Sequence, residues 1–227
     1  MSTPDIAREV ILGRSAKIWQ ALAKRPGMAA RFACAISHTE LPLFTFTKHD
    51  RVWVLAYSRQ PQDNSRMLQQ LQAAGVAEIV YITSSSTIIA PRVHCYEYPR
   101  AKKQAEDEAA ALPQGKVLTL GLVVETPDEL PAGINAVTTI DAMAAFMLSP
   151  RWTADGGKRT HLLRIVQRPF GNVLERGLYA LYGALMRVVP RQPCLLRPFD
   201  LMLRIMGMRW YGYTFLSNRL WATSMTS

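Results

Sequence analysis

The stretch "YITSSSTIIAPRVHCYEYPRAKKQAE", residues 81–106, joins an apolar run to three serines and then to a charged segment. The serines, Ser84 to Ser86, follow the apolar run directly, which places them at the end of a predicted buried strand. Further along, Tyr98 and Lys102 are four residues apart and therefore share one face of a helix. The stretch predicts a strand, a polar turn and a helix, the building unit of an α/β sheet.

Short apolar runs alternate with helical periods through the first 150 residues. Strands are predicted at 9–13, 31–37, 51–58, 78–84 and 116–124, with a further candidate at 43–47. Helices are predicted at 14–25, 64–75 and 99–112, the second one capped by Gly75. Strands that alternate with helices predict a parallel, Rossmann-like sheet flanked by helices. Few residues separate the second strand from the 43–47 run, too few for a crossover helix, so one layer is expected to be reduced.

Ser85, Tyr98 and Lys102 carry the chemistry that this pattern suggests. The site of such a sheet lies at the carboxyl ends of its strands, where the serines are predicted to lie. An ammonium near Tyr98 favours the phenolate and lowers the phenol's pKa, and a serine hydroxyl can orient a substrate oxygen. The residues alone leave a second interpretation open, in which the serines belong to a simple turn and the helix is an ordinary charged one.

The same stretch resembles the short-chain dehydrogenases/reductases, in particular the extended branch of nucleotide-sugar epimerases, dehydratases and 3β-hydroxysteroid dehydrogenases. "IVYITSSSTIIA" (79–90) is similar to the strand of that branch that ends in serines, and "YPRAKKQAE" (98–106) to its Tyr-Pro-x-(Ser/Thr)-Lys helix start. "HDRVWVLAYS" (49–58) and "VTTIDAMAAFML" (137–148) resemble two further segments of the branch. The resemblance covers roughly residues 8–150.

The resemblance implies an NAD(P)-dependent oxidoreductase, epimerase or dehydratase, acting on a nucleotide-sugar or a related intermediate of polysaccharide synthesis. It implies that Ser85 orients the substrate, that Tyr98 is the acid/base, and that Lys102 binds the cofactor ribose and tunes Tyr98. The cofactor contacts that it implies are Gly13, Arg14, Ser15, Ala16, Ile18, Ser37, Ala56, Tyr57, Ser58 and Lys102.

The cofactor half of the signature departs from the family pattern. In "GRSAKIW" (13–19), Gly13 remains, but Ala16 and Trp19 replace the glycines that allow close pyrophosphate approach and close helix packing. The second predicted strand ends in "ISHTE" (36–40), without an acidic residue at the expected place for ribose hydroxyls, and Arg14 favours NADP. Ala101 replaces the usual Ser/Thr before the lysine. The alternative function is therefore a non-catalytic reductase-like protein, either a dinucleotide sensor or a membrane-associated scaffold.

Charge divides the chain near Pro150. Residues 1–150 have a net charge of +1, whereas residues 151–227 have +9, with 11 arginines among 12 cations. We therefore predict a dinucleotide-binding domain at 1–150 and a small, basic, mostly helical region at 151–227. Helices are predicted there at about 170–189 and 198–208, and neither is apolar enough to span a bilayer.

The basic region has two interpretations that the sequence leaves open. Arginines and aromatic residues among Leu and Met suit the interface of an anionic membrane, so 168–221 is a candidate docking segment. Otherwise these helices cap the core or form a homodimer interface. Nucleic acid is not predicted, because the arginines lie among large apolar residues and no RNA- or DNA-binding signature is present.

The cysteines and the first residues bear on location. Three cysteines, odd in number and far apart, suit free thiols in a reducing compartment. "MSTPDIAREV" (1–10) lacks the basic start and apolar core of a signal peptide. We therefore expect a cytoplasmic protein, on the inner face of the membrane if the tail docks there. The histidines and cysteines share no ligand spacing, so no metal is expected.

Overall fold

A six-stranded parallel sheet forms the centre of the molecule in the computed structural model, which describes residues 6, 8–32, 34–150, 158–188, 193–210 and 212–225. Its strands, in spatial order, are β2 (Cys34–Ile36), β1 (Arg8–Leu12), β3 (Asp50–Val54), β4 (Glu78–Ser84), β5 (Gly115–Leu120) and β8 (Arg159–Leu162). The strand order reverses between β1 and β3, which makes their carboxyl ends the topological switch point. The predicted Rossmann-like α/β fold is confirmed.

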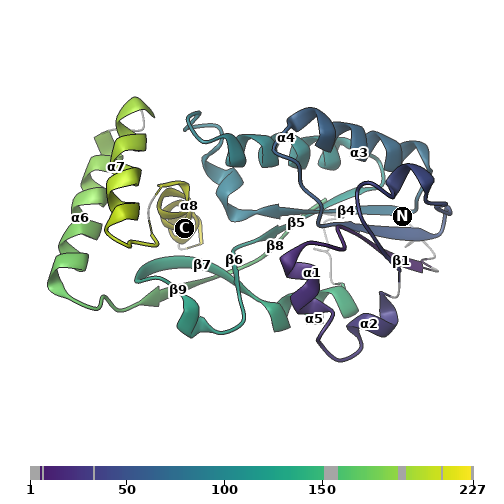
Figure 1. Cartoon of the computed structure of the whole chain (residues 1–227), viewed down its shortest axis with the longest axis horizontal. Helices are drawn as coiled ribbons and strands as arrows, with labels where there is room; N and C mark the ends of the chain where they lie inside the picture. The colour runs from purple at the N-terminus through teal and green to yellow at the C-terminus, as the bar shows by residue number, and fades with distance from the viewer. Residues whose placement is uncertain are drawn as a thin grey trace.

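Helices cover both faces of this sheet (Figure 1). One layer consists of α3 (Pro61–Ala73) and α4 (Glu97–Ala111), and the other of α1 (Lys17–Leu22), α2 (Met28–Arg31) and α5 (Ile140–Leu148). Val10 and Val52 face α3 and α4, whereas Ile11 and Trp53 face the other layer, so each strand buries both of its faces. This is why the strands read as continuous apolar runs in the sequence.

The connection between β2 and β3 contains no α-helix, as the short spacing predicted. The strand predicted at 43–47 is wrong: a single 3₁₀ turn, η1 (Leu41–Leu43), is followed by irregular backbone. Phe44 and Phe46 explain the apolar pattern, because they pack against the core from this irregular segment. The alternating apolar pattern at 43–47 therefore reflects two phenylalanines that pack against the core, and not a strand.

The strand predicted at 116–124 is divided between two sheets. After β5, the chain passes Gly121 and enters β6 (Leu122–Val124), which pairs with β7 (Gly133–Thr139) in a second sheet of order β6-β7-β9. A Cβ atom on Gly121 would lie 2.4 Å from the carbonyl oxygen of Ala136, so only glycine fits this close backbone approach. A further 3₁₀ turn, η3 (Pro127–Glu129), lies in the β6–β7 connection.

The boundary predicted near Pro150 does not coincide with a break between the sheets. β8 lies beyond it in the sequence and completes the main sheet beside β5, while β9 (Arg164–Arg168) pairs antiparallel with β7. The boundary was predicted from the change in net charge along the sequence. Strand pairing depends instead on backbone hydrogen bonds and buried side chains, about which net charge carries no information.

Three helices follow where two were predicted: α6 (Val173–Val188), α7 (Pro193–Ile205) and α8 (Gly212–Ser224). α6 and α7 stand at one end of the molecule, and α8 lies between them and the sheets (Figure 1). Their shared core contains Tyr182, Leu203, Trp210 and Phe215. Within the described ranges, no helix combines the length and the apolar character that crossing a bilayer requires.

Candidate functional site

The serine run forms a capped turn at the carboxyl edge of the sheet. β4 ends at Ser84 and leads directly into η2 (Ser85–Ile89). The Ser84 Oγ atom accepts hydrogen bonds from the Ser86 backbone N–H at 3.3 Å and from the Ser86 hydroxyl at 3.1 Å. Thr87 Oγ1 donates to the Ser84 carbonyl oxygen at 3.0 Å. The serines therefore do belong to a turn, as one interpretation held.

The same serines also line a cavity of about 370 Å³, which we call the Ser–Tyr–Lys cavity. It lies beyond the carboxyl ends of β3, β4 and β5, and its wall includes all three predicted catalytic residues. The polar side chains that line the cavity come from β4, η2, α4 and α8. They are Thr83, Ser84, Ser85, Ser86, Tyr98, Lys102, Tyr213, Thr214, Ser217 and Asn218. Residues distant in sequence thus meet at one place.

Tyr98 is half-buried in this wall, and its pKa differs from the expectation. Burial, together with the neighbouring Tyr213, raises the pKa of Tyr98 to about 12, although a hydrogen bond with the Ser84 side chain lowers it. The predicted lowering of the Tyr98 pKa by Lys102 is therefore wrong. The hydrogen-bonding serine is also Ser84, one residue before the predicted Ser85, whose carbonyl oxygen is engaged elsewhere.

Lys102 is buried, with 7% of its surface exposed. Its Nζ atom donates to the carbonyl oxygen of Ile82 at 3.1 Å and lies 4.8 Å and 4.9 Å from the ring centroids of Tyr57 and Tyr81. Burial lowers the pKa of Lys102 to about 8. The amine is thus enclosed by a carbonyl group and two aromatic rings.

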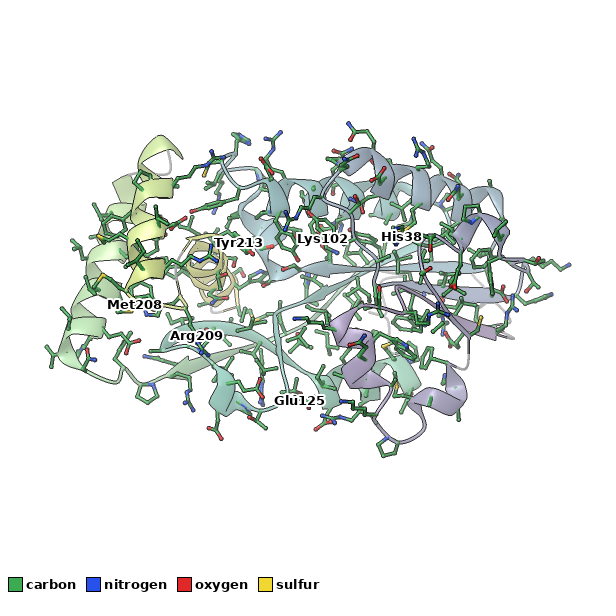
Figure 2. The ribbon with its side chains drawn as sticks, in the orientation of Figure 1. His38, Lys102, Glu125, Met208, Arg209 and Tyr213 are labelled. Carbon is green, nitrogen blue, oxygen red and sulfur yellow. The ribbon has the colours of Figure 1, made fainter. Side chains whose placement is uncertain are left out.

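Tyr57 lines a second cavity and contacts two residues that line the first. Its ring meets the Tyr98 ring edge to face, with 5.2 Å between centroids, and it covers Lys102. Tyr57 also lines a cavity of about 550 Å³ beside β3 and α3, the β3–α3 cavity, together with His38, Ala56 and Ser58. Figure 2 shows Tyr213, Lys102 and His38 following one another from α8 toward α3. Tyr57 therefore links the walls of the two cavities, because it lines one and contacts Tyr98 and Lys102 of the other.

The glycine loop after β1 is a tight turn at the switch point. Gly13 has a φ of +121°, and a Cβ atom there would lie 2.7 Å from the backbone nitrogen of Ala56. The N–H groups of Gly13 and Arg14 both donate to the carbonyl oxygen of Ile36, at 2.8 Å and 3.0 Å. Trp19, at the third glycine position of the family pattern, is buried and meets Phe32 edge to face. The core accommodates this indole.

The carboxylate of Glu40 lies close to the end of β2, where the sequence predicted no acidic residue. Arg14 Nη2 lies 2.8 Å from Glu40 Oε1, and the Ser37 N–H donates to Glu40 Oε2 at 2.8 Å. The Ser37 hydrogen bond and the Arg14 guanidinium lower the pKa of Glu40. The sequence interpretation missed Glu40 because a turn at residues 37–40 carries it back toward the glycine loop. Arg14, on which the preference for NADP was based, is thereby paired with a carboxylate.

The predicted cofactor contacts divide into three groups. Ile18 and Lys102 line the Ser–Tyr–Lys cavity, and Ala56, Tyr57 and Ser58 line the β3–α3 cavity. The remaining ones lie in the loops after β1 and β2 and are not among the residues that line these two cavities; they are Gly13, Arg14, Ser15, Ala16 and Ser37.

The part of the site that the sequence interpretation missed comes from α8. The Trp221 Nε1 group donates to the Ser85 carbonyl oxygen at 2.8 Å, and the Ala136 N–H donates to Asn218 Oδ1 at 3.1 Å. Tyr213 stacks on Tyr98 with 5.6 Å between ring centroids. The interpretation that the C-terminal helices pack on the core is confirmed for α8, which closes one side of the cavity. The aromatic residues at 210–221 were the only signal of this role.

Asn218 has an unused hydrogen-bond donor at this wall. Its side chain is 2% exposed, and its Nδ2 group has no hydrogen-bond partner among the described residues. Its Oδ1 atom accepts the Ala136 N–H, which determines which end of the amide is the free donor. A buried donor without a partner costs free energy, so a ligand oxygen in the cavity is a natural partner.

Comparison with known proteins gives matches among solved structures alone, since no protein-family model and no curated protein matches the chain. A short-chain dehydrogenase/reductase superfamily protein from Agrobacterium tumefaciens with bound NAD is 12% identical, with a TM-score of 0.53 over 78% of this chain and 83% of that one. The structure of gox2253 is 16% identical, with a TM-score of 0.52 over 86% and 83%. MoeE5 in complex with UDP-glucose and NAD is 16% identical, with a TM-score of 0.50 over 70% and 78%. The chain has the fold of the short-chain dehydrogenases/reductases, as the stretch at 81–106 predicted.

Proposed function

We propose that the protein is an NAD(P)-dependent oxidoreductase of the short-chain type, acting at a carbonyl or carbinol carbon in the Ser–Tyr–Lys cavity. The observation that carries this proposal is that Tyr98, hydrogen-bonded to Ser84, and Lys102 line one cavity at the carboxyl edge of the sheet. A bound nicotinamide would supply or accept the hydride. The chain's own residues would hold the substrate oxygen and transfer its proton.

The β3–α3 cavity of about 550 Å³ would hold the adenosine half of a dinucleotide. It includes Ala56, whose backbone nitrogen lies against Gly13 in the turn after β1. The nicotinamide half fits only if Tyr57 turns aside, because its ring covers Lys102, the residue expected to bind the ribose. The proposal therefore includes a rotation of the Tyr57 side chain on cofactor binding.

Tyr98 would act as a proton donor. With its pKa raised to about 12, the phenol is neutral near pH 7 and can protonate an alkoxide that forms on a substrate carbonyl. Ser84, which is hydrogen-bonded to Tyr98, would hold the same substrate oxygen. These properties favour carbonyl reduction near neutral pH over alcohol oxidation.

The polar lining of the cavity supports a hydroxyl-rich substrate, and we retain a nucleotide-sugar or related sugar as the proposed class. The free Nδ2 donor of Asn218 and the hydroxyl of Thr214 face a sugar-sized space next to Tyr98. For the cofactor, the Arg14–Glu40 pair favours NAD, because a carboxylate near the ribose would repel a 2′-phosphate.

Calorimetric titration with NAD⁺, NADH, NADP⁺ and NADPH tests cofactor binding directly. We expect micromolar binding, tightest for the NAD pair. A panel of sugar nucleotides and simple carbonyl compounds, followed by nicotinamide absorbance, then tests turnover. Tyr98→Phe should retain binding and lose turnover. Failure of all four nucleotides to bind would overturn the proposal, as would undiminished turnover in Tyr98→Phe.

A second function is favoured by the Tyr57 ring over Lys102. If that ring stays in place, the chain is a non-catalytic reductase-like protein that senses a dinucleotide or acts as a scaffold. Dinucleotide binding without turnover of any panel compound would support the sensor. Stable membrane or protein association without dinucleotide binding would support the scaffold.

A further inference from the structure

The outer side of α7 is an exposed apolar and basic face, independent of the oxidoreductase proposal. Leu196, Phe199 and Leu203 point into the core shared with Tyr182 and Trp210. The opposite side of the helix and the residue after it carry a set of side chains that we call the α7 face: Arg197, Leu201, Met202, Arg204, Ile205 and Met206.

The α7 face exposes large apolar side chains to an unusual degree. Leu201 is 58% exposed and Ile205 is 78% exposed, and they lie four residues apart on one side of the helix. Met202 and Met206 repeat this spacing beside them. α6 adds exposed Val173, Leu174 and Leu181 on the neighbouring helix. Single exposed apolar residues need no explanation, but four of them within the six residues 201–206 mark an interaction surface.

The charged residues of the α7 face are both arginines. Arg197 and Arg204 are seven residues apart and therefore flank the apolar group on the same side. Neither of them, nor the exposed Arg176 and Arg209, forms an ion pair with a side chain in the described ranges. The only acidic residue of α7, Asp200, points inward and accepts hydrogen bonds from Tyr96 and Tyr182.

We infer that the α7 face docks the protein on an anionic lipid surface. Leucine, isoleucine and methionine side chains would enter the boundary between headgroups and acyl chains, while the arginines meet lipid phosphates. A second copy of this chain is the weaker partner, because a symmetric contact would bring two sets of like-charged arginines together. Together with α6, the docking helix lies at one end of the molecule, beyond α8 (Figure 1).

The α7 face is connected to the candidate active site. Arg204 and Arg209 line a further cavity of about 430 Å³, which shares Tyr213 and Thr214 with the Ser–Tyr–Lys cavity. Met208 and Arg209 lie beyond Tyr213 on the side of α7 in Figure 2. Docking would therefore hold this cavity close to lipid headgroups.

Flotation with vesicles tests the inference. The full chain is mixed with vesicles of phosphatidylcholine alone, or with about one third phosphatidylglycerol, at low and high salt. We expect flotation with the anionic vesicles, at least about tenfold weaker with phosphatidylcholine alone, and weakened by salt. Flotation equal on both vesicle types, or on neither, would overturn the inference.

Two double variants separate the apolar and the charged parts of the face. Leu201→Gln with Ile205→Gln, and Arg197→Gln with Arg204→Gln, should each reduce flotation by about tenfold or more. The matched control is Leu43→Gln with Arg92→Gln, an exposed leucine and an exposed arginine elsewhere, which should float like wild type. Circular dichroism verifies that each variant is folded. Equal flotation of all variants would refute the assignment to α7. So would a concentration-dependent dimer that Leu201→Gln with Ile205→Gln abolishes, because a second copy would then occupy the face.

Discussion

The Nζ atom of Lys102 lies 4.8 Å from the centroid of the Tyr57 ring, which at the same time contacts the ring of Tyr98. One aromatic side chain thus covers the cation and borders the phenol of the candidate site. In the sequence, Tyr57 follows Ala56 shortly after β3. The accessibility of Lys102 to any ligand therefore depends on the orientation of Tyr57.

Replacing Tyr57 with alanine should strengthen dinucleotide binding. If the ring blocks the path between the two cavities in most molecules, its removal abolishes the cost of turning it aside. We expect about tenfold tighter binding of the preferred nucleotide. This is the gain expected if the conformation with the Tyr57 ring turned aside is about 10% populated in wild type. Calorimetric titration measures the change. Tyr57→Phe keeps the ring and should bind like wild type; unchanged or weaker binding in Tyr57→Ala would contradict the gating role.

Replacing Lys102 with methionine should stabilise the protein at neutral pH. Burial lowers the pKa of Lys102 to about 8 from an ordinary value of 10.5, so the folded chain holds this proton less tightly than the unfolded chain. The contribution of Lys102 to stability is therefore least favourable below pH 8, and it improves as the pH rises from 8 to 10.5. At pH 7 the gain in Lys102→Met is on the order of 2 kcal/mol, after the lost hydrogen bond to Ile82 offsets part of it.

Urea denaturation of wild type and Lys102→Met at several pH values measures this gain. The difference between the two proteins should shrink as the pH rises above about 8. Lys103→Met is the matched control, because Lys103 pairs with Glu106 and Asp107 on the outer side of the same helix. That variant should gain no stability. A Lys102→Met protein that is less stable than wild type at pH 7 would contradict the prediction. It would show that the hydrogen bond to Ile82 and the two aromatic rings outweigh the cost of burying the ammonium.

The pH dependence of catalysis should reflect the raised pKa of Tyr98. Near pH 7 the phenol is protonated, since its pKa is about 12, so carbonyl reduction should be insensitive to pH. Alcohol oxidation requires the phenolate and should accelerate about tenfold per pH unit as long as the pH stays below the pKa of Tyr98. Steady-state rates in both directions test this. Tyr98→Phe should lower kcat by about 10²–10⁴-fold and remove the slope, whereas a Tyr98→Phe profile parallel to wild type would assign the slope to another group.

The amino ends of the strands carry a buried ion network that should dominate electrostatic stability. Arg51 donates to Glu78 Oε2 at 2.6 Å and to Glu9 Oε1 at 3.0 Å, and both carboxylates are buried. Arg51→Met leaves these charges partly uncompensated and should lower the free energy of unfolding by about 3 kcal/mol or more. Arg168→Met breaks an exposed pair with Asp128 and should cost about 1 kcal/mol or less. Equal losses in urea denaturation would contradict the difference in burial.

Several parts of the fold were predictable because their causes are local. The buried strand at 78–84, the serine turn and the helix predicted at 99–112 follow from apolar runs, polar turn residues and helical spacing within a few residues. The same local rules failed at 43–47, where Phe44 and Phe46 pack from irregular backbone, and at Gly121, where one apolar run enters two sheets. Hydrophobic periodicity predicts neither feature, because each depends on which distant segment of the chain packs or pairs with these residues.

The site shows the same limit at single residues. Spacing placed Tyr98 and Lys102 on one helix face and the serines at a strand end, and the structure brings them to one cavity. Which serine meets Tyr98 depends on the exact path of the turn, and the answer, Ser84, differs by one residue from the family assignment. Glu40 was missed because its position relative to Arg14 arises from a turn between the second strand and η1.

By itself the sequence determined the strand–turn–helix unit at 81–106, the parallel sheet and the basic character of the C-terminal third. These features depend on residues close together in the chain. Only the tertiary structure decided that Tyr57 covers Lys102, that α8 closes the cavity with Tyr213 and Asn218, and that Leu201 and Ile205 remain exposed on α7. Each of these depends on burial and packing between distant segments, where side-chain volume and desolvation decide both the geometry and the pKa values.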